Sequence, residues 1–264
     1  MIRTLALFLA AVTILPVLFS SDSAAQNDDE KSYFGIRGAI SLPNIVGGGD
    51  QEITRNYRSR TAANFGAFVE VGITKNLSIQ PEVDFASQGG KRSGIQPITS
   101  PLPGLPPLPG QYYFGDFENT AILNYIEVPV MVKYTFVPDR KQSFYLLGGP
   151  YAGFLINAKT KTRGSSTIYI DNSGTPLLLP PANQPLPPIS FDADTDVTDS
   201  IKRFNFGITA GGGVKFRHSS KNHFFVEARG AYGLTTIQRD PATAGESHTG
   251  NLLISFGYAF GLGK

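Results

Sequence analysis

The stretch Asn251-Leu-Leu-Ile-Ser-Phe-Gly-Tyr-Ala-Phe-Gly-Leu262 decides the fold expected for this chain. In an extended strand, successive side chains point to opposite faces. One face of this stretch is apolar and rich in aromatic residues, whereas the other carries small or polar residues such as Asn251 and Ser255. A strand of a soluble sheet can alternate in the same way, so the interpretation depends on whether other segments repeat the pattern.

Six further segments repeat this alternation, and their polar faces carry charges. In the segment 77–87, Ile79 and Val83 share one face while Glu82 and Asp84 share the other. Apolar side chains toward lipid and polar ones toward an enclosed interior are typical of a membrane β-barrel. We therefore predict an all-β fold, an eight-stranded antiparallel up-and-down transmembrane β-barrel. Strands are expected at 32–42, 63–73, 77–87, 121–136, 143–158, 203–217, 223–237 and 251–262.

One of these segments, 143–158, is apolar or small on both faces, so the pattern alone does not identify its lipid side. Aromatic residues near the strand ends suit an interfacial girdle, although an ordinary sandwich core would also use them. The residues expected in that girdle are Tyr134, Phe136, Phe216, Phe224, Tyr258 and Phe260.

The connections between the expected strands alternate in length. Outer-membrane barrels have short turns on the periplasmic side and long loops outside, so both ends of the barrel are expected at the periplasmic side. A soluble barrel has no reason to sort its loops this way. The proline-rich outer loop 88–118 is expected to be extended without forming a strand, and 159–201 is expected to be a second long outer loop with its own proline cluster.

The N-terminus has the pattern of a targeting segment. Arg3 precedes an apolar run from Leu5 to Phe19, and Ser23 and Ala25 are small residues suited to cleavage. We predict a signal peptide at 1–25 that is cleaved after Ala25, a mobile leader at 26–31 and an outer-membrane β-barrel domain at 32–264. The chain contains no cysteine, and its formal net charge of +2 does not indicate nucleic-acid binding.

Charged residues on the inward faces are predicted to form a structural network in the lumen. An eight-stranded barrel has an interior just wide enough for side chains to fill, and buried charges must pair. Glu127 with Lys133 and Glu227 with Arg229 are plausible pairs, depending on strand register. A proton or ion path is the alternative use of such residues. The expected members are Arg37, Glu70, Glu82, Asp84, Glu127, Lys133, Lys215, Glu227 and Arg229.

No catalytic, cofactor or metal site is predicted. Asp192, Asp194 and Asp196 have part of a calcium-loop spacing, but Val197 stands where such a loop needs glycine, so a solvated acidic loop is preferred. His248 is expected in a polar outer loop with Ser247, Glu246 and Asp240 nearby in sequence, which is weak support for an enzyme. We therefore expect no enzymatic activity.

Three segments resemble the PorT-like outer-membrane β-barrel family of Bacteroidetes. They are Asn124-Tyr-Ile-Glu-Val-Pro-Val-Met-Val-Lys-Tyr134, Tyr145-Leu-Leu-Gly-Gly-Pro-Tyr-Ala-Gly-Phe-Leu155 and Phe204-Asn-Phe-Gly-Ile-Thr-Ala-Gly-Gly-Gly-Val-Lys-Phe216. The resemblance implies a small porin-family barrel of eight strands in the outer membrane. The family often has Asp where Asn205 stands. Its founding member is associated with type IX secretion, but most relatives have no assigned role.

Four functions remain open from the sequence. The preferred hypothesis is a structural or interaction barrel that contacts outer-membrane lipid and meets the environment or a protein partner through its outer loops. The alternatives are a narrow channel or transport accessory, a component of a secretion machine, and a soluble periplasmic ligand-binding barrel of lipocalin type.

Overall fold

The computed structural model describes residues 32–48, 52–102, 104–106, 111–138, 140–181, 183–219 and 221–262. The expected signal peptide and leader lie outside the described residues. No described helix has both the length and the apolar character needed to cross a bilayer.

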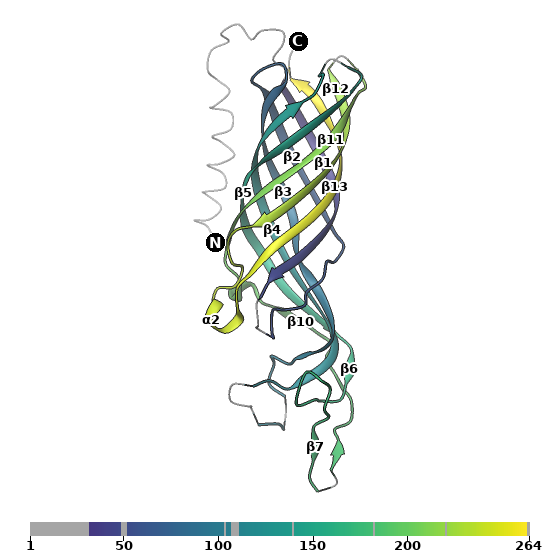
Figure 1. Ribbon diagram of the computed structural model, residues 1–264, viewed down its shortest axis with the longest axis vertical. Coiled ribbons are helices and arrows are strands. Elements are labelled where there is room, and N and C mark those ends of the chain that lie inside the picture. Colours follow the sequence, from purple (N-terminus) through teal and green to yellow (C-terminus); the bar gives the residue numbers. More distant parts are fainter. Residues whose placement is uncertain are drawn as a thin grey trace.

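Eight long antiparallel strands form a closed ring (Figure 1). Each pairs with the next along the chain, and the first and last close the ring from Ser32 opposite Leu262 to Gly47 opposite Ser247. The eight-stranded up-and-down barrel predicted from the sequence is confirmed. The strands are β1 (Ser32–Gly47), β2 (Ala62–Gly72), β3 (Leu77–Pro97), β4 (Phe114–Thr135), β5 (Gln142–Arg163), β11 (Phe204–Arg217), β12 (Asn222–Gly233) and β13 (Ser247–Leu262).

The barrel is apolar outside and polar inside. Ile40 and Phe256 point outward and are 63% and 58% exposed, whereas Glu82 and Arg229 point inward and are 2% and 4% exposed. A soluble protein rarely leaves such extensive apolar surface in water. The apolar side chains on the outer wall are therefore placed where a bilayer would cover them.

The strand β5, whose faces the sequence left unassigned, turns Tyr145, Leu147 and Tyr151 inward and Phe144 outward. Opposite β4 the register shifts, with Ile156 left over as one extra residue. The six girdle aromatics lie beside the short turns in three close pairs. These pairs are Tyr134 with Phe136, Phe216 with Phe224, and Tyr258 with Phe260.

Three strands continue well beyond the barrel on the long-loop side. The ladder between β3 and β4 runs out to Pro97 opposite Phe114, so the prediction that residues 88–118 form no strand was wrong. The ladder passes through Gly89, where only glycine fits, because its φ is +117° and a Cβ there would overlap the Ala121 carbonyl. Pro97 is tolerated because it closes the ladder, where its missing N–H matters least.

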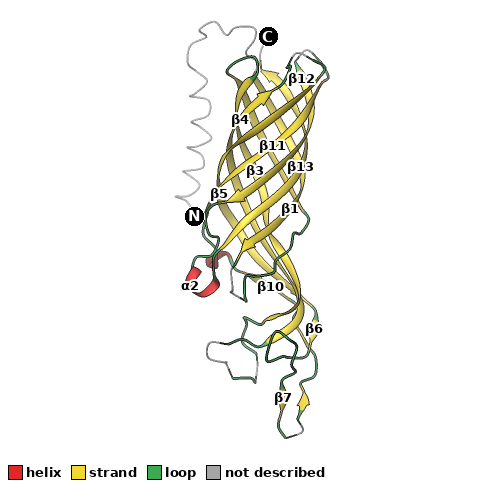
Figure 2. Ribbon diagram, in the orientation of Figure 1, coloured by secondary structure: helices red, strands yellow, loops and turns green. Residues whose placement is uncertain are grey.

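These extensions and the segment after β5 form a projecting unit, here called the outer arm (the described residues of 88–120 and 159–201; Figures 1 and 2). Its small apolar core contains Ile98, Phe117 and Ile168. The segment 159–201, expected to be a loop, contains paired strands. Its elements are β6 (Ser165–Ser166), β7 (Leu178–Leu179), β8 (Gln184–Pro185), β9 (Ile189–Ser190), β10 (Ala193–Asp196) and the 3-10 turn η1 (Thr198–Ser200).

Three further boundaries differ from the sequence prediction. The first strand extends to Gly47 because β13 begins at Ser247 and pairs with it along its whole length. The strand β12 ends at Gly233, where its pairing with β11 stops, so the prediction that it runs to residue 237 was wrong. A four-residue helix, α2 (Pro241–Ala244), lies in the connection that follows.

Candidate functional site

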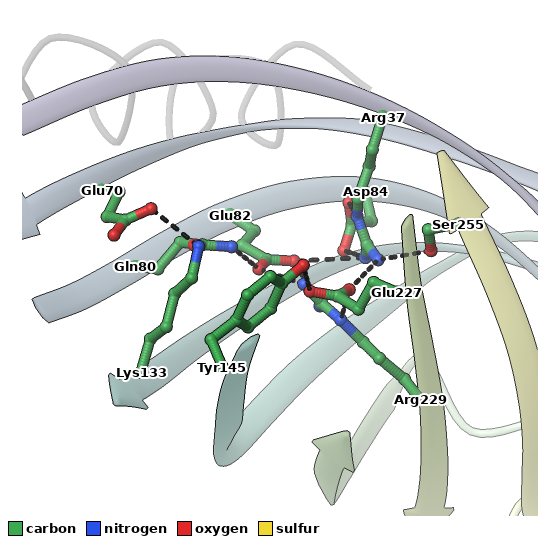
Figure 3. Close-up of polar contacts among 10 residues, drawn as sticks. All are labelled: Arg37, Glu70, Gln80, Glu82, Asp84, Lys133, Tyr145, Glu227, Arg229 and Ser255. Carbon is green, nitrogen blue, oxygen red and sulfur yellow. Dashed lines mark hydrogen bonds and ion pairs between the residues drawn. The ribbon is translucent and has the colours of Figure 1, made fainter. Parts of the chain in front are cut away.

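The centre of the lumen holds a cluster of charged side chains from β1, β3 and β12 (Figure 3). Arg37 donates to Asp84 from Nε at 3.2 Å and from Nη2 at 2.5 Å, and the same Nη2 lies 3.2 Å from Glu82. The same guanidinium lies 3.8 Å from Glu227. These side chains are at most 7% exposed, so the charges are held almost entirely by one another.

Arg229 is the other centre of this cluster. Its two terminal nitrogens donate to the two oxygens of Glu82 at 2.7 and 2.8 Å, and its Nε donates to Glu227. Such bidentate pairs are stronger than single charged hydrogen bonds and fix the orientation of both groups. Tyr145 Oη adds a hydrogen bond of 2.9 Å to Glu227, so β5 is also connected to the cluster.

A second ion pair lies toward the short turns and is connected to the first cluster through Gln80. Lys133 Nζ lies 2.8 Å from Glu70 and 3.2 Å from the Gln80 side-chain oxygen. Gln80 in turn donates to Glu82 at 2.7 Å. The ammonium of Lys133 also lies 4.3 Å from the centre of the Tyr145 ring, a cation–π arrangement.

Glu127, one of the nine expected residues, stands apart from these pairs. Glu127 accepts a hydrogen bond from Gln88 at 2.9 Å, and no described Lys or Arg nitrogen lies within ion-pair distance of it. The expected pairing of Glu127 with Lys133 was therefore wrong, because the register places Lys133 beside Glu70. Lys215 lines a small cavity with Glu70 near the short turns. The expected pairing of Glu227 with Arg229 is present.

Glycines on the inner wall make room for this network. A Cβ on Gly66 would overlap the Asp84 carboxylate, and one on Gly213 would lie 2.5 Å from Tyr145 Oη. The glycine run in the segment 211–213 lies in β11, and Gly213 contributes this gap.

Apolar layers fill the lumen on both sides of the charges. Phe68, Met131 and Phe225 pack toward the short turns, and Leu123 and Leu155 pack toward the outer arm. The cavity beside Arg37 and Glu127 measures about 20 Å³, room for about one water molecule. The described lumen is therefore a packed core.

Sequence reasoning missed several members of the network. Alternation puts Gln80 on the same inward face as Glu82, but its role as the bridge between two ion pairs depends on the register of β3 against β4. Tyr145 had no usable signal because both faces of its strand are apolar. Asn205, at the position often occupied by Asp in the resembling family, lies outside this network, where it accepts from Thr235 Oγ1 at 2.9 Å and donates to Thr249 at 3.0 Å.

The aspartates that suggested calcium lie on β10 and its approach, where they contact other protein groups. Asp194 pairs with Arg163 at 2.6 Å, and the hydrogen bond from Arg163 holds the pKa of Asp194 below its ordinary value. Asp192 accepts the N–H of Gly164. Among the described residues, no three potential ligands gather into a metal site.

His248, expected in a loop, lies in β13 and stacks on Tyr232 at 5.7 Å between ring centroids. Ser247, its neighbour in sequence, is fully buried. Successive strand residues face opposite sides, so the chain does not direct this serine and histidine at a common point.

The closed ring, the apolar outer wall and the charged lumen define a small outer-membrane β-barrel. A family model described as "Outer membrane protein beta-barrel domain" matches residues 24–239. The chain therefore belongs to this family and is a β-barrel of the bacterial outer membrane. No curated protein sequence matches it.

Several solved barrels are similar to this chain at low identity. Neisserial surface protein A is 10% identical, with 86% of this chain and 96% of that chain covered and a TM-score of 0.38. The outer membrane protein OprG from Pseudomonas aeruginosa is 8% identical, with coverage of 89% and 96% and a TM-score of 0.39. Ail, the attachment invasion locus protein of Yersinia pestis, is 15% identical, with coverage of 87% and 98% and a TM-score of 0.34.

Proposed function

We propose that this barrel is a structural or interaction protein that works through its outer arm, and that it is neither a pore nor an enzyme. The observation that carries the proposal is the buried network around Arg37 and Arg229. A permeating ion would have to displace Glu82, which both guanidiniums hold and which is 2% exposed. Breaking one partner out of a buried ion pair is costly.

The outer arm supports an interaction role. It extends away from the barrel with its own apolar core of Ile98, Phe117 and Ile168, so it presents a shaped surface. Ion pairs such as Arg163 with Asp194 lie on its exposed side. Binding residues are often placed on projecting segments that a rigid scaffold positions. The partner in this proposal is a protein or another component of the surroundings.

The resemblance of the segments 124–134, 145–155 and 204–216 also supports placing the chain in the PorT-like group of Bacteroidetes, within the porin family. We further propose that the signal peptide is cleaved after Ala25, on the grounds of the small residues that precede Gln26. Participation in a secretion machine is a second candidate function, which rests on this resemblance.

Planar-bilayer recording tests the closed lumen. The purified barrel is expected to give no steady single-channel current in molar potassium chloride, because the packed charges leave no continuous water path. A large open porin recorded in the same lipid is the positive control. A reproducible ohmic current from the wild-type barrel would contradict the proposal and favour the channel alternative.

Removal of the tip of the outer arm tests the interaction role. Replacing residues 167–188 by a two-residue Asn-Gly turn joins β6 directly to β9, which already pair with each other. We expect this variant to fold, judged by heat-modifiable gel migration, but to lose proteins that co-isolate with the wild type from intact outer membranes. An unchanged set of co-isolated proteins would contradict a role for this tip, and a set typical of a secretion machine would favour the second candidate.

A further inference from the structure

A cavity of about 560 Å³ lies where the barrel meets the outer arm. It is here called the vestibule. Its wall is built from the end of β1, the connection after it, the outer parts of β3, β4 and β5, and β10, which Figure 1 shows at the loop end of the barrel. Its volume lies within the range of pockets that hold small organic ligands.

The vestibule is mostly apolar and has a closed floor. Ile45 and Leu123 line it from the barrel, and Phe117 and Phe191 line it from the outer arm. The lining residues Ile45 and Leu123 belong to the same apolar layer as the fully buried Tyr125, which blocks the way into the lumen. A molecule in the vestibule would therefore not pass on into the lumen.

One wall carries a buried cation without a counter-charge. Arg92 is 6% exposed, and it donates from Nε to Gln96 at 2.5 Å and from one terminal nitrogen to the Glu52 carbonyl at 2.8 Å. Its guanidinium lies 5.3 Å from the centre of the Tyr57 ring. Among the described residues, no carboxylate pairs with Arg92 and its other terminal nitrogen has no partner.

Two further polar atoms in the wall are unsatisfied. Thr54 Oγ1 and Asn119 Oδ1 are buried and have no hydrogen-bond partner among the described residues. Both residues line the vestibule together with Arg92. Buried polar groups in folded proteins are almost always paired. A wall that holds a cation without a counter-charge beside two orphaned polar atoms is therefore incomplete by itself, and the cation calls for an anionic head group.

We propose that the vestibule binds a small amphipathic anion, with an apolar body and a single carboxylate, of the medium-chain fatty acid class. The apolar body would fill the space between Leu123 and Phe191. The carboxylate would accept a hydrogen bond from the free terminal nitrogen of Arg92. Asp192, exposed at the rim, disfavours a second negative charge on the ligand. This inference goes beyond the interaction role proposed above.

The absence of tryptophan from the chain allows a direct test. A Phe191→Trp variant places one fluorescent reporter in the vestibule wall, and a Phe256→Trp variant places one on the lipid-facing surface. Both barrels are reconstituted in lipid nanodiscs at pH 7.5 and titrated with 10-bromodecanoate or 10-bromodecanol. Bromine quenches the reporter it approaches, and the two probes differ only in the head group.

We expect 10-bromodecanoate to quench the vestibule reporter saturably, at roughly tenfold lower concentration than the alcohol, as one charged hydrogen-bonded contact predicts. Adding Arg92→Gln should abolish this preference while leaving the alcohol unchanged, and Arg92→Lys should retain part of it. The Phe256→Trp reporter controls for partition into the bilayer. Equal titrations at both reporters, or equal affinity for acid and alcohol, would overturn the proposal. Neither result would bear on the closed lumen, which the bilayer recordings test separately.

Discussion

An Arg229→Met variant is expected to lower the free energy of unfolding by about 3–5 kcal/mol. Arg229 makes a bidentate pair with Glu82 and also contacts Glu227, and all three side chains are at most 2% exposed. Methionine preserves much of the volume of the side chain but leaves two buried carboxylates facing each other with less compensating charge. Urea titration of the barrel in lipid vesicles, followed by circular dichroism, measures the loss.

Arg163→Met is the matched control for this variant. Arg163 also forms a short ion pair, 2.6 Å from Asp194, but both partners are about half exposed to solvent. Exposed pairs contribute about 0–1 kcal/mol, so this variant should unfold almost like the wild type. If Arg229→Met were equally mild, the lumen charges would not be holding the barrel together.

A triple variant distinguishes the cost of unpaired charge from the cost of lost packing. Combining Arg229→Met with Glu82→Gln and Glu227→Gln removes the carboxylates that the arginine neutralises. Neutral replacement of a whole buried ion cluster is often tolerated, whereas removal of one partner is not. We expect the triple variant to regain most of the stability lost in Arg229→Met. If the triple variant recovers no stability, the loss in Arg229→Met comes from disrupted packing around residue 229.

The barrel could be predicted from the sequence because lipid outside and a polar lumen inside make apolar and polar residues alternate along nearly every strand. Residues such as Ile79 and Asp84 identify opposite faces without any knowledge of their neighbours. The alternation of short and long connections then determined strand number and the side on which the ends lie. Both signals are local, so neither depended on strand register.

The outer arm could not be predicted in the same way. Beyond the barrel, the strands leave the apolar environment, and β3 there contains the glycines Gly89 and Gly90 and ends at Pro97. Such residues are typical of loops. What keeps this segment extended is its pairing with β4, from Gln88 opposite Leu123 onward, a contact made across the long connection that follows.

The members of the lumen network were predictable, but their pairing was not. Period two places Glu127 and Lys133 on the same inner face. Which of them meet depends on how β2, β3 and β4 are staggered, and that stagger brings Glu70 to Lys133 and leaves Glu127 with Gln88. The vestibule was missed for a related reason, because Arg92 lies in a segment predicted to be irregular.

Gly66→Ala, a change of one methyl group, is expected to destabilise the barrel by about 1–3 kcal/mol, as overpacking of a filled core does. The new Cβ would overlap the Asp84 carboxylate and lie 2.6 Å from the Val83 carbonyl, so Asp84 must move away from Arg37. The same urea titration in vesicles measures the effect.

Gly38 supplies the control for this substitution on the neighbouring strand. Gly66 pairs with Arg37 across β1 and β2, so Gly38, the next residue along, faces the opposite side of the wall. A Cβ on Gly38 meets nothing within 4 Å, and alanine in a strand is better than glycine by about 0.5–1 kcal/mol. Gly38→Ala should therefore be neutral or slightly stabilising. The two variants have the same composition and lie in one hairpin. Equal stabilities would mean that the inner wall accommodates an added methyl group, and a fully packed lumen cannot do this.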